Sequence, residues 1–169
     1  GMNHVKTLNK LDSLGGVVEN KLSVIKGVKK KFPSCKVFID IEEALVQNFD
    51  GYIVATPAST HFDIAIKIIE NNKPLLVEKP MTLDYSSSIK LSNFAKEKDV
   101  NLMVGHVLLF HPAFQKMKEL INDGLLGDIQ YIYSNRLNLG TFRTNENVFW
   151  SFAPHDISLF NYFFEQKPL

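Results

Sequence analysis

Two side chains in the sequence stand where they could move a proton. Lys79 follows an apolar run, residues 74–77, and precedes Pro80, whereas His155 follows Pro154. If the apolar run is a strand of a parallel sheet, Lys79 lies just past its carboxyl end, where ligands of such sheets bind. A histidine in the first turn of a helix stays neutral because the dipole disfavours imidazolium, which suits a base near pH 7. The structural alternatives are a surface lysine before a turn and a helix-capping or core histidine.

Other reaction types find little support in the sequence. No His-x3-His or His-Glu-x-x-His pair occurs among its five histidines, so we expect no metal site. A Gly-x-Ser-x-Gly elbow is also absent from the sequence, which argues against Ser/His/Asp hydrolysis. Proton transfer by Lys79 and His155 therefore remains the chemistry to explain.

Composition and charge exclude several classes of protein. The 169 residues are 45% hydrophobic and 22% charged, which is typical of a globular chain. Lys and Arg number 19 against 18 Asp and Glu, so charge gives no case for binding nucleic acid or a membrane surface. The most apolar stretch, 102–110, is too short to span a bilayer. The single Cys35 excludes an internal disulfide and fits a reducing cytoplasm, where we expect the protein to work.

Short apolar runs alternate with helical patterns along most of the chain. Strands are predicted at 16–19, 36–39, 52–55, 74–77 and 101–105. Helices are predicted at 7–14, stopped by Gly15 and Gly16; at 21–32, stopped by Pro33; at 40–46, capped by Asp40; at 59–71, with Thr60 and Asp63 as a capping box; at 84–98, capped by Asp84; and at 111–123, stopped by Gly124. The strands are continuous apolar runs, so both sheet faces are predicted to be covered by helices.

This alternation predicts an α/β fold with a doubly wound, Rossmann-like parallel sheet that is incomplete. Such a sheet begins with a strand, a Gly-rich turn and a helix whose N-terminus receives a pyrophosphate. This sequence starts inside what resembles that helix and contains no Gly-x-Gly-x-x-Gly. We therefore expect the first strand and the Gly-rich turn to be missing, which would leave the strands on either side of that central position unpaired.

The pattern changes after Gly127. Residues 128–138 alternate like a half-buried strand, and Pro154 is predicted to start a helix that runs to Phe164. We interpret residues 2–124 as a partial dinucleotide-binding domain and residues 125–169 as the start of a second, α+β domain.

Five segments together resemble the Gfo/Idh/MocA oxidoreductases, the group of glucose-fructose oxidoreductase and inositol dehydrogenase. They are Ala55-Thr56-Pro57-x3-His61, Val77-Glu78-Lys79-Pro80, Gly105-His106 with Phe110-His111-Pro112, Gly124-x2-Gly127, and Ala153-Pro154-His155-Asp156-Ile157. They cover essentially the whole chain in the family's order. The resemblance implies reversible hydride transfer between NAD or NADP and a carbinol of a sugar or sugar nucleotide.

The resemblance also implies roles for single residues. Lys79 would touch the nicotinamide ribose and the substrate hydroxyl, and His155 would be the acid/base partner of that hydroxyl. Glu78, beside Pro80, would bind ribose or orient Lys79. Some family members place an Asp four residues before the histidine, where this chain has Ser151.

Further residues are expected along the cofactor. Thr56, Pro57 and His61 match the loop that passes the pyrophosphate and adenosine, with an ordinary helix residue as the alternative for His61. Glu19 ends the first predicted strand, where a carboxylate accepts from the ribose 2′-OH and favours NAD over NADP. The remaining cofactor candidates are Pro80, which follows Lys79, and His106, near the expected nicotinamide. Arg136, Arg143 and Trp150 are candidates for contact with the substrate, with an ordinary surface or core position as the alternative for each.

Two expectations concern the chain as it stands. Without a Gly-rich turn, its NAD affinity should be weak or absent, and unpaired strand edges should make it self-associate as a homo-oligomer. The alternative to an impaired sugar dehydrogenase is a catalytically dead remnant that serves as a self-associating module without dinucleotide binding.

Overall fold

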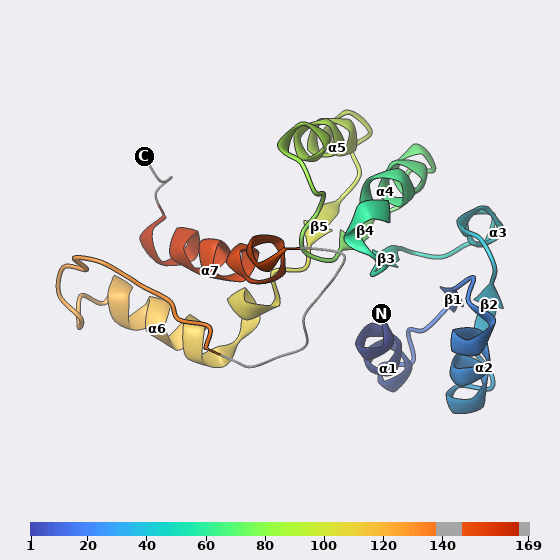
Figure 1. The fold of residues 1–169 in the computed structure, drawn as a ribbon, viewed down its shortest axis with the longest axis horizontal. Coiled ribbons are helices and arrows are strands. Elements are labelled where there is room, and N and C mark those ends of the chain that lie inside the picture. The colour runs from blue at the N-terminus through green and yellow to red at the C-terminus, as the bar shows by residue number, and fades with distance from the viewer. Residues whose placement is uncertain (138–146, 166–169) are drawn as a thin grey trace.

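The structure is a computed structural model that describes residues 1–137 and 147–165. Helices and strands alternate from the N-terminus through β5 (Figure 1). In chain order the elements are α1 (Met2–Lys10), β1 (Gly16–Val18), α2 (Leu22–Lys31), β2 (Lys36–Phe38), α3 (Ile41–Leu45), β3 (Tyr52–Val54), η1 (Ala58–Thr60), α4 (His61–Glu70), β4 (Leu75–Val77), α5 (Tyr85–Glu97), β5 (Leu102–Val104), η2 (Val107–Phe110), α6 (Pro112–Asn122) and α7 (Val148–Phe164).

The strands are all parallel and form two sheets. β1 pairs with β2, with Val17 opposite Val37, and β4 lies between β3 and β5, with Leu76 opposite both Ile53 and Met103. Within the described residues no ladder joins β1 to β3. This arrangement confirms the α/β class and the incomplete Rossmann-like parallel fold.

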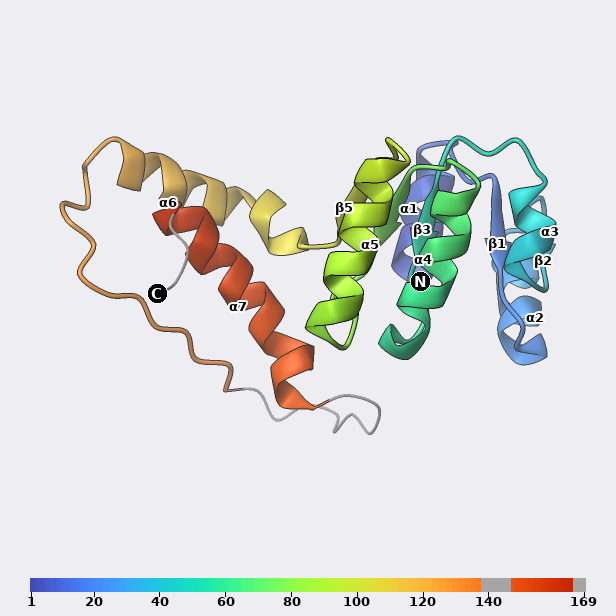
Figure 2. The same cartoon turned by 90° about the horizontal axis from the view of Figure 1, so that it is seen from above.

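The apolar core lies in the three-stranded sheet. α4 and α5 pack together over one face of β3–β5, and α1 lies on the other side of that sheet (Figures 1 and 2). Burying each of its large aliphatic side chains contributes about 1.5–3 kcal/mol. The buried cluster consists of Val54, Ala65, Ile68, Ile69, Leu75, Val77, Leu91 and Ala95.

Two predicted helix caps are confirmed, and one helix end differs from expectation. Asp40 accepts from the Glu43 N–H at 3.0 Å, and Asp84 accepts from the Ser87 N–H at 2.8 Å. α1 stops after Lys10, not at the glycines: Asp12 takes a left-handed conformation (φ 52°), which aspartate tolerates better than most residues. The two glycines make room for aromatic rings instead. A Cβ on Gly15 would lie 2.7 Å from Phe49, and one on Gly16 would lie 2.8 Å from Phe38.

The capping box expected at the start of α4 does not form. The Thr60 hydroxyl donates to the Pro57 carbonyl at 2.8 Å and accepts from the Thr56 hydroxyl, also at 2.8 Å, and it makes no cap hydrogen bond. The short 3₁₀ helix η1 directly precedes α4 and ends at Thr60. Its tighter geometry turns the Thr60 hydroxyl back toward the loop before η1.

α7 starts earlier than its proline suggested. Asn147 caps it by accepting from the Trp150 N–H at 3.0 Å, and Pro154 lies inside the helix. The prediction of a start at Pro154 was therefore wrong, because an asparagine cap upstream supplies the start signal. A proline inside a helix removes one backbone hydrogen bond without preventing helical φ.

The strand predicted at 128–138 does not form over its described part, residues 128–137; Asn138 lies outside the described residues. No other described segment hydrogen-bonds to this stretch as a strand, and alternating polarity alone cannot satisfy its backbone groups. Side chains fasten it to α7 instead. Arg136 donates to Asp156 through Nε at 2.8 Å and Nη2 at 3.0 Å, and Ser134 donates to the same carboxylate at 2.9 Å.

α6 holds α7 through a buried lysine. Lys118 Nζ donates to the Phe163 carbonyl at 3.1 Å and pairs with Glu165 at 2.8 Å. The Lys118 side chain is 10% exposed, whereas that of Glu165 is 74% exposed. A cation at this place also suits the negative end of the helix dipole.

Candidate functional site

β4 carries Lys79 to the helix that bears His155. The Glu78 N–H donates to the Val54 carbonyl at 2.9 Å, so the ladder continues one residue past β4 before the chain turns away. The Lys79 ammonium then donates to the carbonyl of Ser151 in α7 at 2.5 Å. A residue from the partial nucleotide-binding domain and one from the second predicted domain are thus joined across 72 positions of sequence.

His155 lies one helical turn beyond Ser151, on the same face of α7. Burial lowers the pKa of His155, and the positive charges of Lys79, Arg136 and His106 lower it further against the opposing effect of Asp156. The imidazole is therefore neutral near pH 7. The cause differs from the sequence argument: His155 lies seven residues after the start of α7 at Val148, so the helix N-terminus is not responsible.

His106 lies beside this pair. It follows β5, caps η2, and has a pKa lowered by burial. The Nδ1 atoms of His106 and His155 are both buried and have no hydrogen-bond partner within the described part of the chain. Leaving such a group unpaired is costly, so both nitrogens are suited to a ligand hydroxyl.

A groove of about 560 Å³ runs between η2 and α7. Trp150 and Tyr162 provide aromatic surface in it, and Ser158 and Asn161 provide hydroxyl and amide groups. Apolar walls with a few polar groups are typical of small-molecule sites. The lining residues are His106, Leu109, Trp150, Pro154, Ile157, Ser158, Asn161 and Tyr162.

Glu78 is held from two sides. Its Oε1 accepts from His4 Nε2 of α1 at 2.6 Å, and a Cβ on Gly105 would lie 3.0 Å from its Oε2. No local pattern in the sequence indicates a role for His4, because its contact with Glu78 spans 74 positions.

His61 joins two of the loops expected to touch a cofactor. It is 1% exposed, and its Nδ1 and Nε2 each lie 2.9 Å from a carbonyl oxygen, of Pro80 and Thr56 respectively. Both ring nitrogens are thus occupied within the protein. Thr56 and Pro57 are exposed at the carboxyl end of β3, and Pro80 is buried beside them.

The remaining candidates lie outside the loops that follow β3 and β4. Glu19 follows β1 in the two-stranded sheet and accepts from the Lys21 N–H at 2.9 Å. Arg136 is paired with Asp156, so its charge is engaged within the protein. Arg143 lies outside the described residues, and Trp150 lines the groove.

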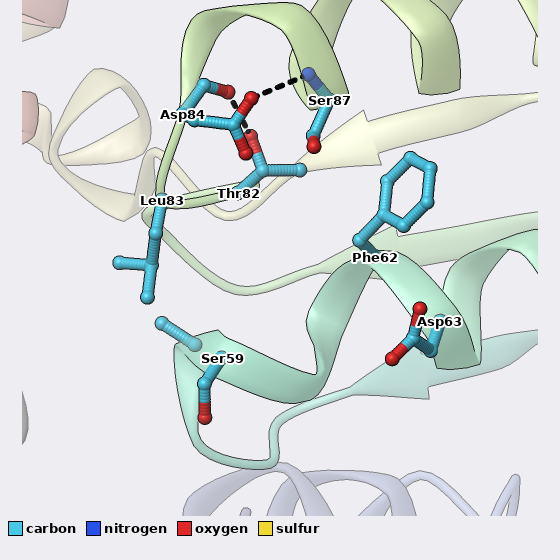
Figure 3. A pocket seen from close by; sticks show the side chains of 8 residues that line it. Ser59, Phe62, Asp63, Thr82, Leu83, Asp84 and Ser87 are labelled. Atoms are coloured by element: carbon cyan, nitrogen blue, oxygen red, sulfur yellow. Dashed lines mark hydrogen bonds between the residues drawn. The ribbon is translucent and has the colours of Figure 1, made fainter.

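A second cavity, of about 260 Å³, lies between the starts of α4 and α5 (Figure 3). Asp63 and Asp84 line it, and two carboxylates disfavour an anionic ligand. Hydrogen bonds from Ser86 and Ser87 lower the pKa of Asp84 to about 2, so it stays charged. Asp84 serves as the cap of α5, and the pair of carboxylates does not suit a phosphate.

Metal ligands and membrane-spanning helices are two further features that a functional site could need. Among the described residues, no group of three or more His, Cys, Asp or Glu side chains could hold a metal ion. No described helix is long and apolar enough to cross a membrane.

Comparison with known proteins decides the family. Residues 2–106 match the sequence model of the group described as "Oxidoreductase family, NAD-binding Rossmann fold". The chain belongs to the Gfo/Idh/MocA oxidoreductase family. The match ends at His106 and therefore covers Lys79 but not α7.

Two curated relatives of this Gfo/Idh/MocA chain have named activities. The scyllo-inositol 2-dehydrogenase (NAD(+)) of Bacillus subtilis is 42% identical over 78 residues, which are 46% of this chain and 23% of that protein. The UDP-N-acetylglucosamine 3-dehydrogenase of Acidithiobacillus ferrooxidans is 29% identical over 119 residues, 70% of this chain and 37% of that protein. The chain thus spans well under half the length of either relative.

Solved structures agree with the family. GenD2 from gentamicin A biosynthesis, in complex with NAD, is 32% identical with a TM-score of 0.61 over 66% of this chain and 32% of its own. The apo scyllo-inositol dehydrogenase of Lactobacillus casei has a TM-score of 0.76 at 19% identity over 89% of this chain and 46% of its own. The second likeness supports the fold alone.

Proposed function

We propose that this chain forms the catalytic centre of an NAD-dependent oxidoreductase that oxidises a carbinol of a polyol, sugar or sugar nucleotide. The observation that carries the proposal is the meeting of Lys79 with α7, one turn from His155. The named relatives act on scyllo-inositol and on UDP-N-acetylglucosamine, which support hydroxylated rings as the substrate class. We keep residues 2–124 and 125–169 as the proposed domain division.

Proton removal falls to His155 and Lys79, which meet at α7 next to the groove but are not among its lining residues. His155, kept neutral by burial and by neighbouring positive charge, accepts the hydroxyl proton of the substrate. The Lys79 ammonium stabilises the negative charge that develops on that oxygen. His106 Nδ1 offers a further hydrogen bond to the substrate, and Trp150 packs against its ring.

The carboxyl ends of the strands supply the groups that fit a dinucleotide. NAD, when bound, accepts the hydride from the carbinol carbon. Glu78 accepts from a ribose hydroxyl close to Lys79, and Glu19 accepts from the adenine ribose. Gly105 leaves space beside Glu78 that a Cβ would fill. Thr56 and Pro57 would border the pyrophosphate, and His61, whose buried ring lies between the Thr56 and Pro80 carbonyls, would help to keep these two loops together.

For the 169 residues as they stand, we propose weak NAD binding. Pyrophosphate affinity in this fold comes from backbone N–H groups of a Gly-rich turn, and the sequence contains no Gly-x-Gly-x-x-Gly. Hydrogen bonds to charged groups contribute about 1.5–3 kcal/mol each. Losing two or more would weaken binding by roughly two to four decades, since 1.4 kcal/mol is about tenfold. A micromolar site would become millimolar.

Ligand-observed NMR on the wild-type chain tests this proposal, because saturation transfer detects millimolar binding. We expect NADH to bind with a dissociation constant in the millimolar range, with contacts at both riboses. Where the wild-type chain turns over scyllo-inositol, Lys79→Met and His155→Gln should each abolish this turnover. Neither substitution should change the far-UV circular dichroism spectrum. A micromolar constant would contradict weak binding, and no signal at ten millimolar NADH would contradict the cofactor site.

A second candidate function has its own observation. Phe149 and Phe152 of α7 are 74% and 44% exposed, and large exposed apolar groups favour association with another chain. A self-associating module without dinucleotide binding would bury these side chains between copies. Sedimentation velocity distinguishes the two candidate functions. A self-associating module should form oligomers that Phe149→Glu dissociates, and it should give no NADH signal in the NMR experiment.

A further inference from the structure

α1 contributes a side chain to the site through a contact that the sequence did not indicate. His4 Nε2 lies 2.6 Å from Glu78 Oε1, and the two side chains are only 27% and 28% exposed. The distance is at the short end for a hydrogen bond to a carboxylate. His4 lies in α1, and Glu78 directly follows β4. The bond between them therefore fixes α1 against the carboxyl end of β4.

Within the described residues, the Glu78 carboxylate has a hydrogen-bond partner on Oε1 and none on Oε2. His4 occupies Oε1, and Oε2 lies over Gly105, where even a Cβ would come within 3.0 Å. A glutamate side chain otherwise samples several rotamers, and ordering it lowers the affinity of whatever it binds. Here the protein has ordered it before a ligand arrives, and Oε2 keeps its acceptor capacity.

We propose that His4 is a positioning residue that holds Glu78 ready to accept from the ribose next to the nicotinamide ring. The inference rests on the proposed function, in which Glu78 binds that ribose. It makes α1 part of the site through a side chain, independently of any pyrophosphate contact at the helix N-terminus. His4 itself touches neither substrate nor cofactor.

Binding measurements with each half of the cofactor distinguish a positioning role of His4 from a general effect on stability. Reduced nicotinamide mononucleotide carries the ribose that Glu78 would bind, whereas AMP carries the other ribose. His4→Leu should weaken binding of reduced nicotinamide mononucleotide about five- to tenfold, the effect of leaving one flexible side chain to be ordered by the ligand. AMP binding should not change. His4→Gln, which keeps an N–H donor at similar reach, should restore most of the affinity.

Lys6→Leu is the matched control, because Lys6 is an exposed residue of the same helix. It should leave both affinities as in the wild type. Equal weakening of both halves by His4→Leu would show a merely structural role and overturn the proposal, as would no weakening of either. Failure of His4→Gln to restore binding would also count against it.

A measurement without ligand separates this inference from the proposed function. The side-chain ¹³Cδ resonance of Glu78 reports its hydrogen bonding, and His4→Leu should shift it whereas Lys6→Leu should not. An unshifted resonance overturns the positioning role whatever binds. A wild-type chain that gives no signal at ten millimolar NADH overturns the proposed function, while a shifted ¹³Cδ resonance would still support the role of His4 in holding Glu78.

Discussion

Lys118→Met should release α7, the helix that carries His155, from α6. Lys118 donates to the Phe163 carbonyl, which belongs to the last turn of α7 and has no later residue of the helix to donate to it. Methionine keeps most of the apolar stem and removes the ammonium. The variant therefore tests the hydrogen bond and the charge with little change in packing.

The expected cost follows from the burial of the two partners. A hydrogen bond to a charged group contributes about 1.5–3 kcal/mol, and the ammonium no longer has to be desolvated in the variant, so we expect a net loss of about 1–2 kcal/mol. Glu165→Gln removes only the exposed partner, and exposed pairs contribute about 0–1 kcal/mol. The two variants should thus differ although both break the same ion pair.

Urea unfolding followed by tryptophan fluorescence is the suitable assay, because the single tryptophan, Trp150, lies in α7. With a slope of about 2 kcal/mol per M, Lys118→Met should lower the midpoint by about 0.5–1 M. Glu165→Gln should lower it by less than about 0.5 M. Equal midpoints for the two variants, or no change in Lys118→Met, would refute the view that this bond holds α7.

Three further predictions concern the site. Lys79→Met should raise the pKa of His155 and Asp156→Asn should lower it, because their charges act in opposite directions; shifts of the same sign in an NMR titration would contradict this. Burial lowers the pKa of both His106 and His155 in the folded chain. As the pH falls below about 6.5, these two histidines are protonated more readily in the unfolded chain than in the folded one. The free energy of unfolding should therefore have its highest value above that pH and decrease below it. Urea midpoints at pH 7.5 and 5.5 measure the decline, and a double His→Gln variant that declines equally would disprove the assignment. Gly105→Ala should displace the Glu78 carboxylate, since its Cβ would lie 3.0 Å from Oε2. It should weaken binding of reduced nicotinamide mononucleotide more than that of AMP, whereas unchanged binding would mean that the space beside Glu78 is not needed.

The sequence predicted what is decided locally. Each of the five short strands lies within its predicted apolar run, and Asp40 and Asp84 act as the predicted caps because a cap depends on residues three positions away. Pro154 misled the prediction of α7 because a proline is compatible with helix interior φ, and the decisive signal was the asparagine upstream.

Contacts between distant segments could not be predicted from patterns. The bond between His4 and Glu78 spans 74 positions. The lowered pKa of His155 comes first from burial and then from the charges of Lys79 and Arg136, which lie in other segments of the chain. The segment 128–137 alternates in polarity, but strand formation depends on a partner elsewhere in the fold. Family resemblance made Lys79 and His155 candidates without these contacts, and it gave no indication of His4.

The division of the strands into two sheets gives the molecule two levels of local stability. Most of the fully buried aliphatic side chains belong to β3, β4, α4 and α5, whereas Val28 and Ala44 are the buried ones near β1 and β2 among the described residues. Amide protons of β1 and β2 should therefore exchange through easier local opening than those of β4. Under the proposed function, Glu19 lies on the weaker unit and Glu78 on the stronger one. A dinucleotide that bound to both units would link them. Local opening of the β1–β2 unit would then require the ligand to leave, so ligand binding would couple the opening of the two units.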